Sequence, residues 1–241
     1  TWTPWEVAIG ETYVAGNTRL WYAEPVFGEG RYVQYRIFFR AGTGGLSPSV
    51  RNVRIWHGDT RPGPSANDLM TTRADAFGTS SIITRAQWGA NESWMTSPPE
   101  YRTVRTLVIH HTVTSDGGVD PAAIVRAIYR YHAVDLGWGD IGYNFLIDHA
   151  GRVYEGRFGG PGVVGHHAGS PYNHGSIGIG LIGNLDVNGV PPAMFDSAAN
   201  LIAYESRVWN LNPVGTTYFI DRWIATVFGH RDVSSTACPG R

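Results

Sequence analysis

Histidine side chains and a single cysteine are the residues of this sequence best suited to bind a metal or to carry out hydrolysis. His230 and Cys238 lie eight residues apart in a loop rich in small residues, and the chain has no other cysteine. Imidazole nitrogen and thiolate sulfur are preferred zinc ligands, and a catalytic zinc takes three protein ligands and leaves a fourth position for water. A loop of this length can turn both side chains toward one ion, so the pattern predicts a zinc site that needs one further protein ligand.

The adjacent residues His110 and His111 are the candidates for that further ligand. They follow Leu107-Val108-Ile109, a short apolar run typical of a strand that is buried on both faces. Sites in sheet-based proteins are assembled where strands end. Because neighbouring side chains in a strand point to opposite faces, we expect only one of the two histidines to face the ion. His110 is well placed, but spacing alone does not decide between them.

A cysteine hydrolase is an alternative use of the same residues. It would need Cys238 to be an exposed thiol beside an imidazole, and His230 is near in sequence. The segment Ser235-Thr236-Ala237-Cys238-Pro239 carries no papain-like or caspase-like signature, which counts against this alternative. The lone cysteine also excludes an internal disulfide.

The charge composition excludes several other classes of protein. All 19 basic side chains of the 241-residue chain are arginines. Without lysine there is no Schiff-base amine, phosphate-loop lysine or Ser-Lys dyad. The 20 acidic residues give a net charge of −1, so no broad electrostatic field favours nucleic acid or an anionic membrane. No apolar run approaches the roughly 20 residues of a membrane-spanning helix.

The first part of the chain has the pattern of strands, and we predict a small all-β module with its linker over residues 1–77. Arg31–Phe39 and Val50–Trp56 are rich in aromatic and β-branched residues. Residues 61–68 contain two prolines and no apolar periodicity, which is typical of a connecting segment. The module is a candidate wall-binding domain, and a sandwich core is the alternative role of its aromatic side chains. These aromatic residues include Trp2, Trp5, Trp21, Tyr22 and Trp56.

Strands and helices alternate after Ser81, which predicts an α/β domain over residues 78–241 with a mixed central β-sheet flanked by helices. Asp120-Pro121 is typical of a helix start and Gly137 of its end. The expected strands are 104–110, 142–147, 152–155 and 176–182, and the expected helices are 121–136 and 193–209.

The strand at 176–182 has one bare face. Ile177, Ile179 and Leu181 alternate with Gly178 and Gly180. Glycines at alternating positions indicate that another group approaches the strand closely on that side. We expect the backbone of a helix there, with a ligand as the alternative.

Six sequence blocks occur in the order in which they appear in a known family. They are Ser81-Ile82-Ile83-Thr84-Arg85-Ala86-Gln87-Trp88-Gly89-Ala90, Val108-Ile109-His110-His111-Thr112, Gly137-Trp138-Gly139-Asp140-Ile141-Gly142-Tyr143-Asn144-Phe145, Val153-Tyr154-Glu155-Gly156-Arg157, Ser176-Ile177-Gly178-Ile179, and Gly229-His230-Arg231-Asp232 with Cys238-Pro239-Gly240. From about Ser81 to the C-terminus the chain therefore resembles the peptidoglycan recognition protein and type-2 N-acetylmuramoyl-L-alanine amidase family. The first 77 residues lie outside the resemblance.

The resemblance implies a zinc amidase that uses a zinc-activated water to cleave the bond between N-acetylmuramic acid and the L-alanine of the stem peptide. The family's metal ligands fall on His110, His230 and Cys238, and its catalytic tyrosine falls on Tyr143. Thr236 stands where some phage relatives have a lysine. We expect Tyr143 and Thr236 to donate hydrogen bonds to the developing oxyanion. The side chains implied to contact substrate are His111, Trp138, His167, Tyr172 and Asn173.

The resemblance also carries an alternative, a non-catalytic peptidoglycan-binding protein. Family members that only bind peptidoglycan typically lack the cysteine, so Cys238 favours an enzyme. We expect one Zn²⁺ per chain, a peptidoglycan or muropeptide substrate, no nucleic-acid partner, no membrane insertion and a monomer. The substrate lies outside the cytoplasmic membrane, and the paired cysteines of many animal relatives are absent from residues 113–118. We therefore expect secretion from a bacterium to the cell wall.

Overall fold

The computed structural model describes one short hairpin near the N-terminus and most of the chain after residue 81. The described residues are 10–15, 18–23, 34–38, 50, 53, 55, 82–115 and 120–241. In the hairpin, β1 (Gly10–Ala15) pairs with β2 (Thr18–Ala23) in antiparallel fashion, with Gly10 opposite Ala23. This hairpin agrees with the strand-rich character predicted for the N-terminal region.

Other parts of the predicted β module differ from the structure or lie outside the described residues. Residues 34–38, 50, 53 and 55 are exposed and belong to no strand, so the strands predicted at Arg31–Phe39 and Val50–Trp56 are wrong at these positions. Trp2, Trp5, Trp56 and the connecting segment at residues 61–68 lie outside the described residues. The module at residues 1–77 stays a prediction.

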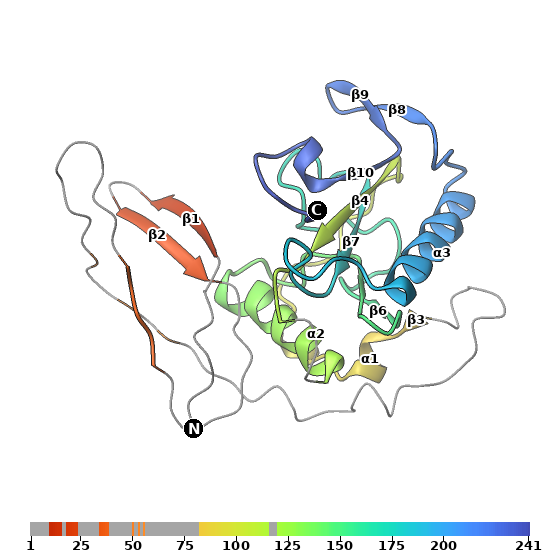
Figure 1. The fold of residues 1–241 in the computed structure, drawn as a ribbon. Coiled ribbons are helices and arrows are strands. Elements are labelled where there is room, and N and C mark those ends of the chain that lie inside the picture. Colours follow the sequence, from red (N-terminus) through yellow and green to blue (C-terminus); the bar gives the residue numbers. More distant parts are fainter. Residues whose placement is uncertain are drawn as a thin grey trace. The chain divides into compact units, whose positions relative to one another are not determined.

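A six-stranded mixed sheet forms the framework of the α/β part, with the order β10-β4-β7-β5-β6-β3 (Figure 1). The strands are β3 (Ile82–Ile83), β4 (Thr106–His111), β5 (Phe145–Ile147), β6 (Val153–Glu155), β7 (Ser176–Leu181) and β10 (Val227–Gly229). β5 and β6 are antiparallel, and every other neighbouring pair in this sheet is parallel. The predicted mixed α/β architecture is confirmed, including the hairpin formed by β5 and β6.

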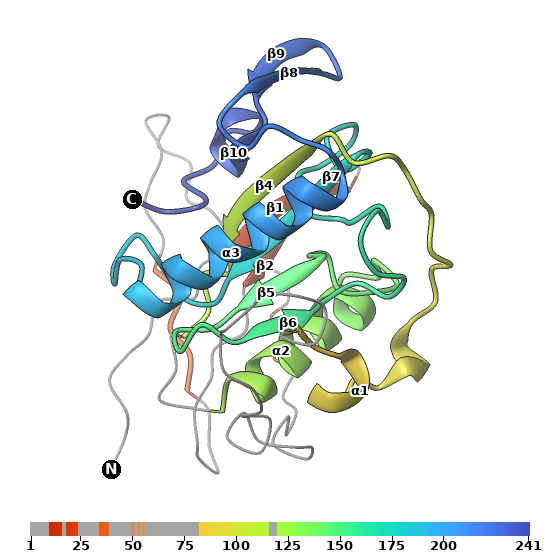
Figure 2. The same ribbon diagram turned by 90° about the vertical axis from the view of Figure 1, so that its right-hand side faces the viewer.

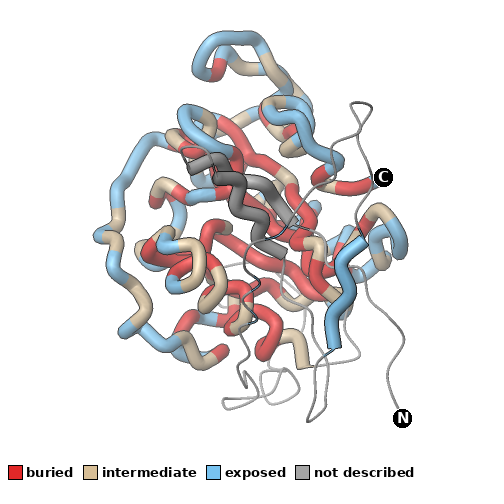
Figure 3. Tube along the Cα trace, turned by 90° about the vertical axis from the view of Figure 1, so that its left-hand side faces the viewer, coloured by how far each residue is buried: buried red, intermediate tan, exposed pale blue. Residues whose placement is uncertain are grey.

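Helices cover both faces of this sheet (Figure 2). The helical segments are α1 (Arg85–Trp88), η2 (Glu92–Trp94), α2 (Pro121–Arg130), η3 (Tyr131–Asp135), α3 (Pro192–Val208) and η4 (His230–Asp232). On one face, Met194 and Leu201 of α3 pack with Ile177 of β7. On the other face, Ile124 and Ile128 of α2 pack with residues of β3, β5 and β6. The buried segments of the tube accordingly run through the middle of the domain (Figure 3).

The sequence signals at the helix ends act as predicted. Asp120 is the N-cap of α2, its Oδ1 accepting a hydrogen bond from the backbone N–H of Ala122 at 3.1 Å, and Pro121 occupies the first turn. α2 does not run as a regular helix to Gly137, because η3 is a single π-helical turn. Such turns occur frequently at functional sites. Gly137, with φ of 71°, then ends the helical segment.

β4 and β7 form the part of the sheet that positions the candidate site. They are parallel, with His110 opposite Gly180, and Gly180 in turn lies opposite Leu146 of β5. Leu146 packs in the α2 core, so His110 points to the same face of the sheet. Over β7 this face is covered by the side chains of Tyr143 and His167. A separate two-stranded hairpin, β8 (Thr216–Phe219) and β9 (Arg222–Ala225), precedes β10.

Candidate metal centre

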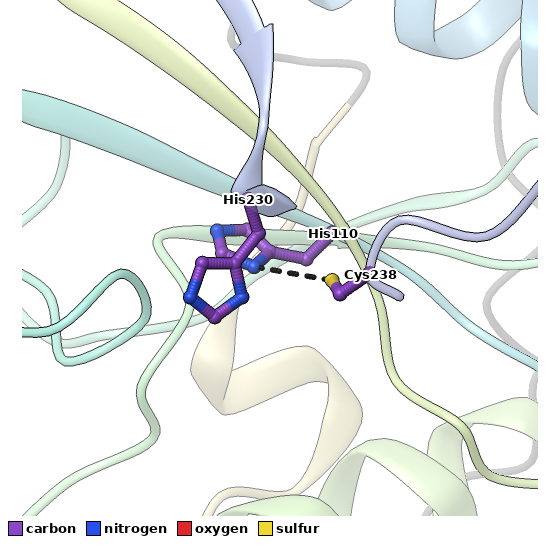
Figure 4. A group of neighbouring side chains, drawn as sticks. All are labelled: His110, His230 and Cys238. Carbon is purple, nitrogen blue, oxygen red and sulfur yellow. Dashed lines mark hydrogen bonds between the residues drawn. The ribbon is translucent and has the colours of Figure 1, made fainter. Parts of the chain in front are cut away.

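His110, His230 and Cys238 come together in space, as the sequence predicts. One ligand atom from each lies within 4.8 Å of the others, and this is the metal-ligand cluster found among the described residues (Figure 4). Nδ1 of His110 lies 3.6 Å from Sγ of Cys238. His110 and Cys238 are buried, with 1% and 8% of their surfaces exposed. His230 is partly exposed, so the cluster has one open side.

Strand pairing brings the two distant parts of the chain to one place. β10 pairs in parallel with β4, with Gly229 opposite Ile109, so the chain leaves the sheet beside His110. One helical turn, η4, then places His230. Arg231 closes the following loop, because its backbone N–H donates to the carbonyl of Cys238 at 2.9 Å and its guanidinium donates to the carbonyl of Ala237 at 2.8 Å.

The donor set fits zinc. Two imidazoles and a thiol are ligands of borderline softness, which zinc binds readily. Ligand atoms at usual Zn–N and Zn–S bond lengths around a tetrahedral ion stand about 3.6 Å apart. The Nδ1–Sγ distance of 3.6 Å between His110 and Cys238 matches that spacing. Burial, with the neighbouring His167 and His230, lowers the pKa of His110 well below its usual value and keeps the ring in the neutral, ligating form.

The ring of His111 points away from the cluster, so His110 is the one of the two adjacent histidines that can act as a ligand. Its Nδ1 accepts a hydrogen bond from the backbone N–H of Leu185 at 3.3 Å. The backbone N–H of His111 donates to Sγ of Cys238 at 3.4 Å. His111 therefore supports the thiol through its main chain, while the ring of His110 faces the cluster.

His167 holds the ring of His110 from behind. Nδ1 of His167 lies 3.0 Å from Nε2 of His110, and both rings are buried. Ser176 continues the chain of contacts, with its Oγ 3.4 Å from Nε2 of His167 and donating to the carbonyl of Tyr172 at 2.6 Å. Burial, the largest cause, lowers the pKa of His167 to about 3, so this ring is neutral. A partner on the non-ligating nitrogen fixes the tautomer and orientation of a metal-binding histidine.

Two side chains of the site occupy the bare face of β7. The prediction that the backbone of a helix lies there is wrong. A Cβ added to Gly178 would clash with the ring of His167. One added to Gly180 would lie 3.0 Å from Cγ of Tyr143. The glycines therefore make room for rings that stand beside His110.

A cavity of about 110 Å³ opens beside the cluster. Its lining residues are His110, His111, Thr112, Val113, Tyr131, His132, Leu136, Trp138, Tyr143, His166, His167, His230, Thr236 and Cys238. None of these lining residues, all from the described part of the chain, carries a carboxylate. The cavity is thus a polar surface of imidazole, hydroxyl and indole groups beside the candidate metal ligands.

Tyr143 and Thr236, the predicted hydrogen-bond donors, both line this cavity. The ring of Tyr143 is half-buried, with its centroid 5.4 Å from that of His110. Thr236 is exposed, and its Oγ1 accepts a hydrogen bond from the backbone N–H of Cys238 at 3.2 Å. Trp138 stacks on His166 with ring centroids 4.3 Å apart, and together they form one wall.

Tyr172 and Asn173 belong to the same loop as His167 but do not line the cavity. Oδ1 of Asn173 accepts hydrogen bonds from the backbone N–H groups of His167 at 2.9 Å and Ala168 at 2.7 Å. The hydroxyl of Tyr172 donates to Asp221 at 2.9 Å. In the structure both residues hold the loop that carries His167.

Sequence reasoning missed His132 and Tyr131 of the π-helical turn. His132 is buried, and its Nδ1 accepts from the backbone N–H of Gly142 at 3.0 Å. Its ring lies between Trp138 and Tyr143, at centroid distances of 4.6 and 5.6 Å. A π-helical turn changes which residues face the sheet, and apolar periodicity at 3.6 residues cannot show that.

The block around Arg85 has a structural role. The buried guanidinium of Arg85 donates to Oδ1 of Asp140 at 3.1 Å and pairs with Glu92 at 2.6 Å. Asp140 also accepts from the backbone N–H groups of Ile141 at 2.7 Å and Phe158 at 2.9 Å. This network fixes the loop that leads into Tyr143.

The fold and the cluster define a mixed α/β protein with three candidate metal ligands, His110, His230 and Cys238, beside a small polar cavity. Comparison with known proteins gives the family. Residues 100–241 match the family described as N-acetylmuramoyl-L-alanine amidase. The chain belongs to this family, which confirms the resemblance found in the sequence.

Relatives and solved structures agree with this assignment. Peptidoglycan-recognition protein SC2 of Drosophila melanogaster is 38% identical over 162 residues, which cover 66% of this chain and 80% of the relative. Peptidoglycan recognition protein 1 of Bos taurus is 38% identical over 164 residues, covering 66% and 78%. A Drosophila PGRP-LB mutant in complex with tracheal cytotoxin superposes with a TM-score of 0.55 at 31% identity, covering 67% of this chain and 89% of that one.

Proposed function

We propose that this protein is a zinc-dependent amidase that hydrolyses the bond between N-acetylmuramic acid and L-alanine in bacterial peptidoglycan. The observation that carries the proposal is the convergence of His110, His230 and Cys238, whose ligand atoms lie within 4.8 Å of one another. The description of the matched family supports the reaction, and a relative solved with tracheal cytotoxin supports a muropeptide as the substrate class.

When bound, zinc supplies a Lewis acid that polarises the scissile carbonyl and makes water a nucleophile near neutral pH. The chain supplies three ligands and leaves one side of the cluster open to the cavity. His167 positions His110 through the 3.0 Å contact between their ring nitrogens. Because three protein ligands leave an open position, the arrangement favours catalysis over a closed structural site.

Tyr143 and Thr236 are proposed to stabilise the negative charge that develops on the carbonyl oxygen. Both can donate a hydroxyl hydrogen, and both line the cavity beside the ligands. The chain has no lysine, so no ammonium group assists these neutral donors and the metal. The close approach of Gly180 to the Tyr143 ring holds that ring in place.

Substrate contacts are proposed for His111, Trp138 and His167, all of which line the cavity. Tyr172 and Asn173 act on substrate through the loop that they hold, because Asn173 binds the backbone N–H of His167 at 2.9 Å.

Recognition without hydrolysis is the second candidate function, since the relatives at 38% identity are named recognition proteins. The complete ligand set argues for hydrolysis. A cysteine hydrolase is disfavoured, because Cys238 is only 8% exposed, whereas a nucleophilic thiol must be reached by substrate.

The proposed substrate lies in the bacterial cell wall, which sets where the protein would act. We propose that the protein is secreted by a bacterium and acts in the cell wall, with residues 1–77 as a separate wall-binding module and residues 78–241 as the amidase domain. Among the described residues, no helix has the length and apolar character needed to cross a membrane.

Metal analysis combined with turbidity clearance tests the proposal. The purified full chain should contain about one zinc per molecule and should clear a suspension of purified cell wall. Clearance should be lost with a chelator and restored by added zinc, and Cys238→Ser should abolish both metal retention and clearance.

Two other results would support a recognition protein or a cysteine hydrolase instead of a zinc amidase. Zinc retention and peptidoglycan pelleting without release of stem peptides would establish a recognition protein. Clearance that resists chelators but is lost on thiol alkylation would establish a cysteine hydrolase.

A further inference from the structure

The β8–β9 hairpin has two different faces. Phe219 and Ile224 lie on its inner face and pack with Phe228 in a small core. Tyr218 and Trp223 lie directly opposite each other on the outer face. They are 48% and 72% exposed. Figures 1 and 2 show the hairpin projecting beyond β4 and β10, so its outer face is turned away from the sheet.

The two exposed rings form one fixed aromatic surface. Tyr218 and Trp223 contact each other edge to face, with centroids 6.0 Å apart. Contact between the rings limits their rotation, which lowers the entropic cost of binding a ligand there. Large aromatic side chains exposed together on a short hairpin are typical of a binding surface, because packing of the fold does not require them.

Tyr218 also borders an open cleft of about 480 Å³. Arg102, Arg105 and His174 line this cleft, and the two arginines carry its positive charge. Arg105 directly precedes β4 and His174 nearly precedes β7, so the cleft lies at the amino ends of these parallel strands. Five residues of β-strand, about 16 Å, separate Arg105 from His110, so the cleft lies apart from the candidate metal centre.

The arginines around the cleft and the hairpin tip outnumber the carboxylates nearby. Arg102 pairs with Glu100 at 2.6 Å, and both side chains are about half exposed. Asp221 at the hairpin tip is paired with Arg222 at 2.9 Å and accepts from Tyr172. Arg105 is exposed and makes no side-chain ion pair among the described residues. An acidic group in the cleft would therefore meet Arg105 without displacing a carboxylate.

The hairpin tip keeps a strained backbone. Ile220, which also lines the cleft, has a φ of 60°, and the backbone N–H of Asp221 donates to the carbonyl of Phe219 at 2.8 Å in a tight γ-turn. A β-branched residue rarely adopts the left-handed region, because its side chain clashes with the backbone there. Strain of this kind persists where surrounding contacts over-determine the conformation, here the Tyr172–Asp221 hydrogen bond.

We propose that the outer face of the β8–β9 hairpin and the adjoining arginine cleft bind an acidic polysaccharide. The C–H faces of sugar rings stack on Trp223 and Tyr218, and a carboxylate or phosphate group pairs with Arg105 and Arg102. The carboxylates of peptidoglycan stem peptides and the phosphates of a separate wall polymer share this chemistry. The surface binds glycan whether or not the metal centre hydrolyses it.

Binding measurements on the full chain test this inference. Cys238→Ser serves as the parent protein, because it lacks a zinc ligand and leaves the polymers intact. Its affinity is measured for glycan strands of peptidoglycan, for a phosphate-bearing wall teichoic acid and for neutral dextran. Trp223→Ala and Arg105→Ala should each weaken binding of the acidic polymer about tenfold. Phe195→Ala and Arg207→Ala, which change an exposed aromatic residue and an exposed arginine of α3, are the matched controls and should bind as the parent does.

The results distinguish which wall polymer supplies the acidic group and whether the surface binds acidic polymers at all. Preference for teichoic acid identifies phosphate as the acidic group, and preference for peptidoglycan strands identifies the stem carboxylates. Equal binding of dextran, or unchanged affinity in both Trp223→Ala and Arg105→Ala with the fold intact by circular dichroism, overturns the inference. Because no step depends on turnover, failure here is distinct from failure of the proposed amidase.

Discussion

The two ends of β4 carry opposite kinds of surface. At the carboxyl end, His110 and Cys238 are almost fully buried, and the cavity beside them has no aspartate, glutamate or arginine among its lining residues. At the amino end, Arg105 is exposed and an aromatic pair projects on a hairpin. Burial lowers the pKa of the His110 imidazole and keeps it neutral, which suits a cation. Exposure keeps arginines charged and solvated, which suits an anion.

This contrast places the two proposed binding surfaces at opposite ends of one strand. Residues of the metal end depend on close packing, such as Gly178 against His167, so changes there act over short distances. At the hairpin end, Tyr218, Trp223 and Arg105 are exposed, while Phe219 anchors the hairpin to its small core. We therefore expect the two ends to respond independently to mutation.

Removal of a metal ligand should give the largest effect. Cys238→Ser deletes the thiolate and should lower turnover more than about 100-fold, because loss of a ligand exceeds the 10- to 100-fold cost of losing an outer contact. Turnover is measured by release of stem peptide from a soluble muropeptide, and zinc by elemental analysis after dialysis. Trp223→Ala is the matched control at the other end of β4 and should keep full zinc and full turnover. A reduced zinc content in Trp223→Ala would show that the two ends of β4 do not respond independently.

Tyr143→Phe should give the next largest effect. Loss of one donor to the oxyanion costs about 2.7–4 kcal/mol, which is a 100- to 1,000-fold loss of kcat. Zinc content should stay at that of the parent, because the hydroxyl is not a ligand. Unchanged kcat would show that Tyr143 only packs against Gly180.

His167→Asn should weaken zinc by 10- to 100-fold, because the ring of His110 loses the partner that orients it. Competition with a chromogenic chelator measures the zinc affinity. His166→Asn changes the exposed neighbour that stacks on Trp138 and should leave the affinity for zinc unchanged. Equal affinities in the two variants would remove the positioning role of His167.

A buried carboxyl on α3 should affect stability alone. Burial raises the pKa of Glu205 from about 4.5 to about 7, since among the described residues Trp209 is the one side chain that donates to the buried carboxyl. The native state therefore holds this proton more tightly than the unfolded chain between these values, and stability should fall as pH rises from about 4.5 to about 7. The loss should be about 3 kcal/mol at most.

Denaturant titrations at several pH values check this prediction. Glu205→Gln should flatten the pH dependence in this window and should leave zinc content and glycan binding unchanged. Glu100→Gln, at an exposed carboxylate, is the control and should retain the slope of the parent. A slope that persists in Glu205→Gln would assign it to another group.

Local sequence signals were sufficient for most elements of the domain. Asp120-Pro121 marks the start of α2, and the apolar run before His110 marks a strand buried on both faces. The same signals failed at residues 34–38, where aromatic and β-branched residues are exposed and form no strand. Strand propensity depends on the partners that cover a segment, and composition does not supply them.

By itself the sequence determined the family, the ligand types and the absence of lysine chemistry, because residue identity and spacing carry that information. Only the tertiary structure decided that His110 faces the cluster and His111 turns to Leu185, since strand direction fixes which neighbour points to which face. It also decided that the bare face of β7 receives His167 and Tyr143, and that arginines far from the candidate metal ligands lie beside an aromatic hairpin. Such placements arise from pairing between strands distant in sequence, which no local pattern encodes.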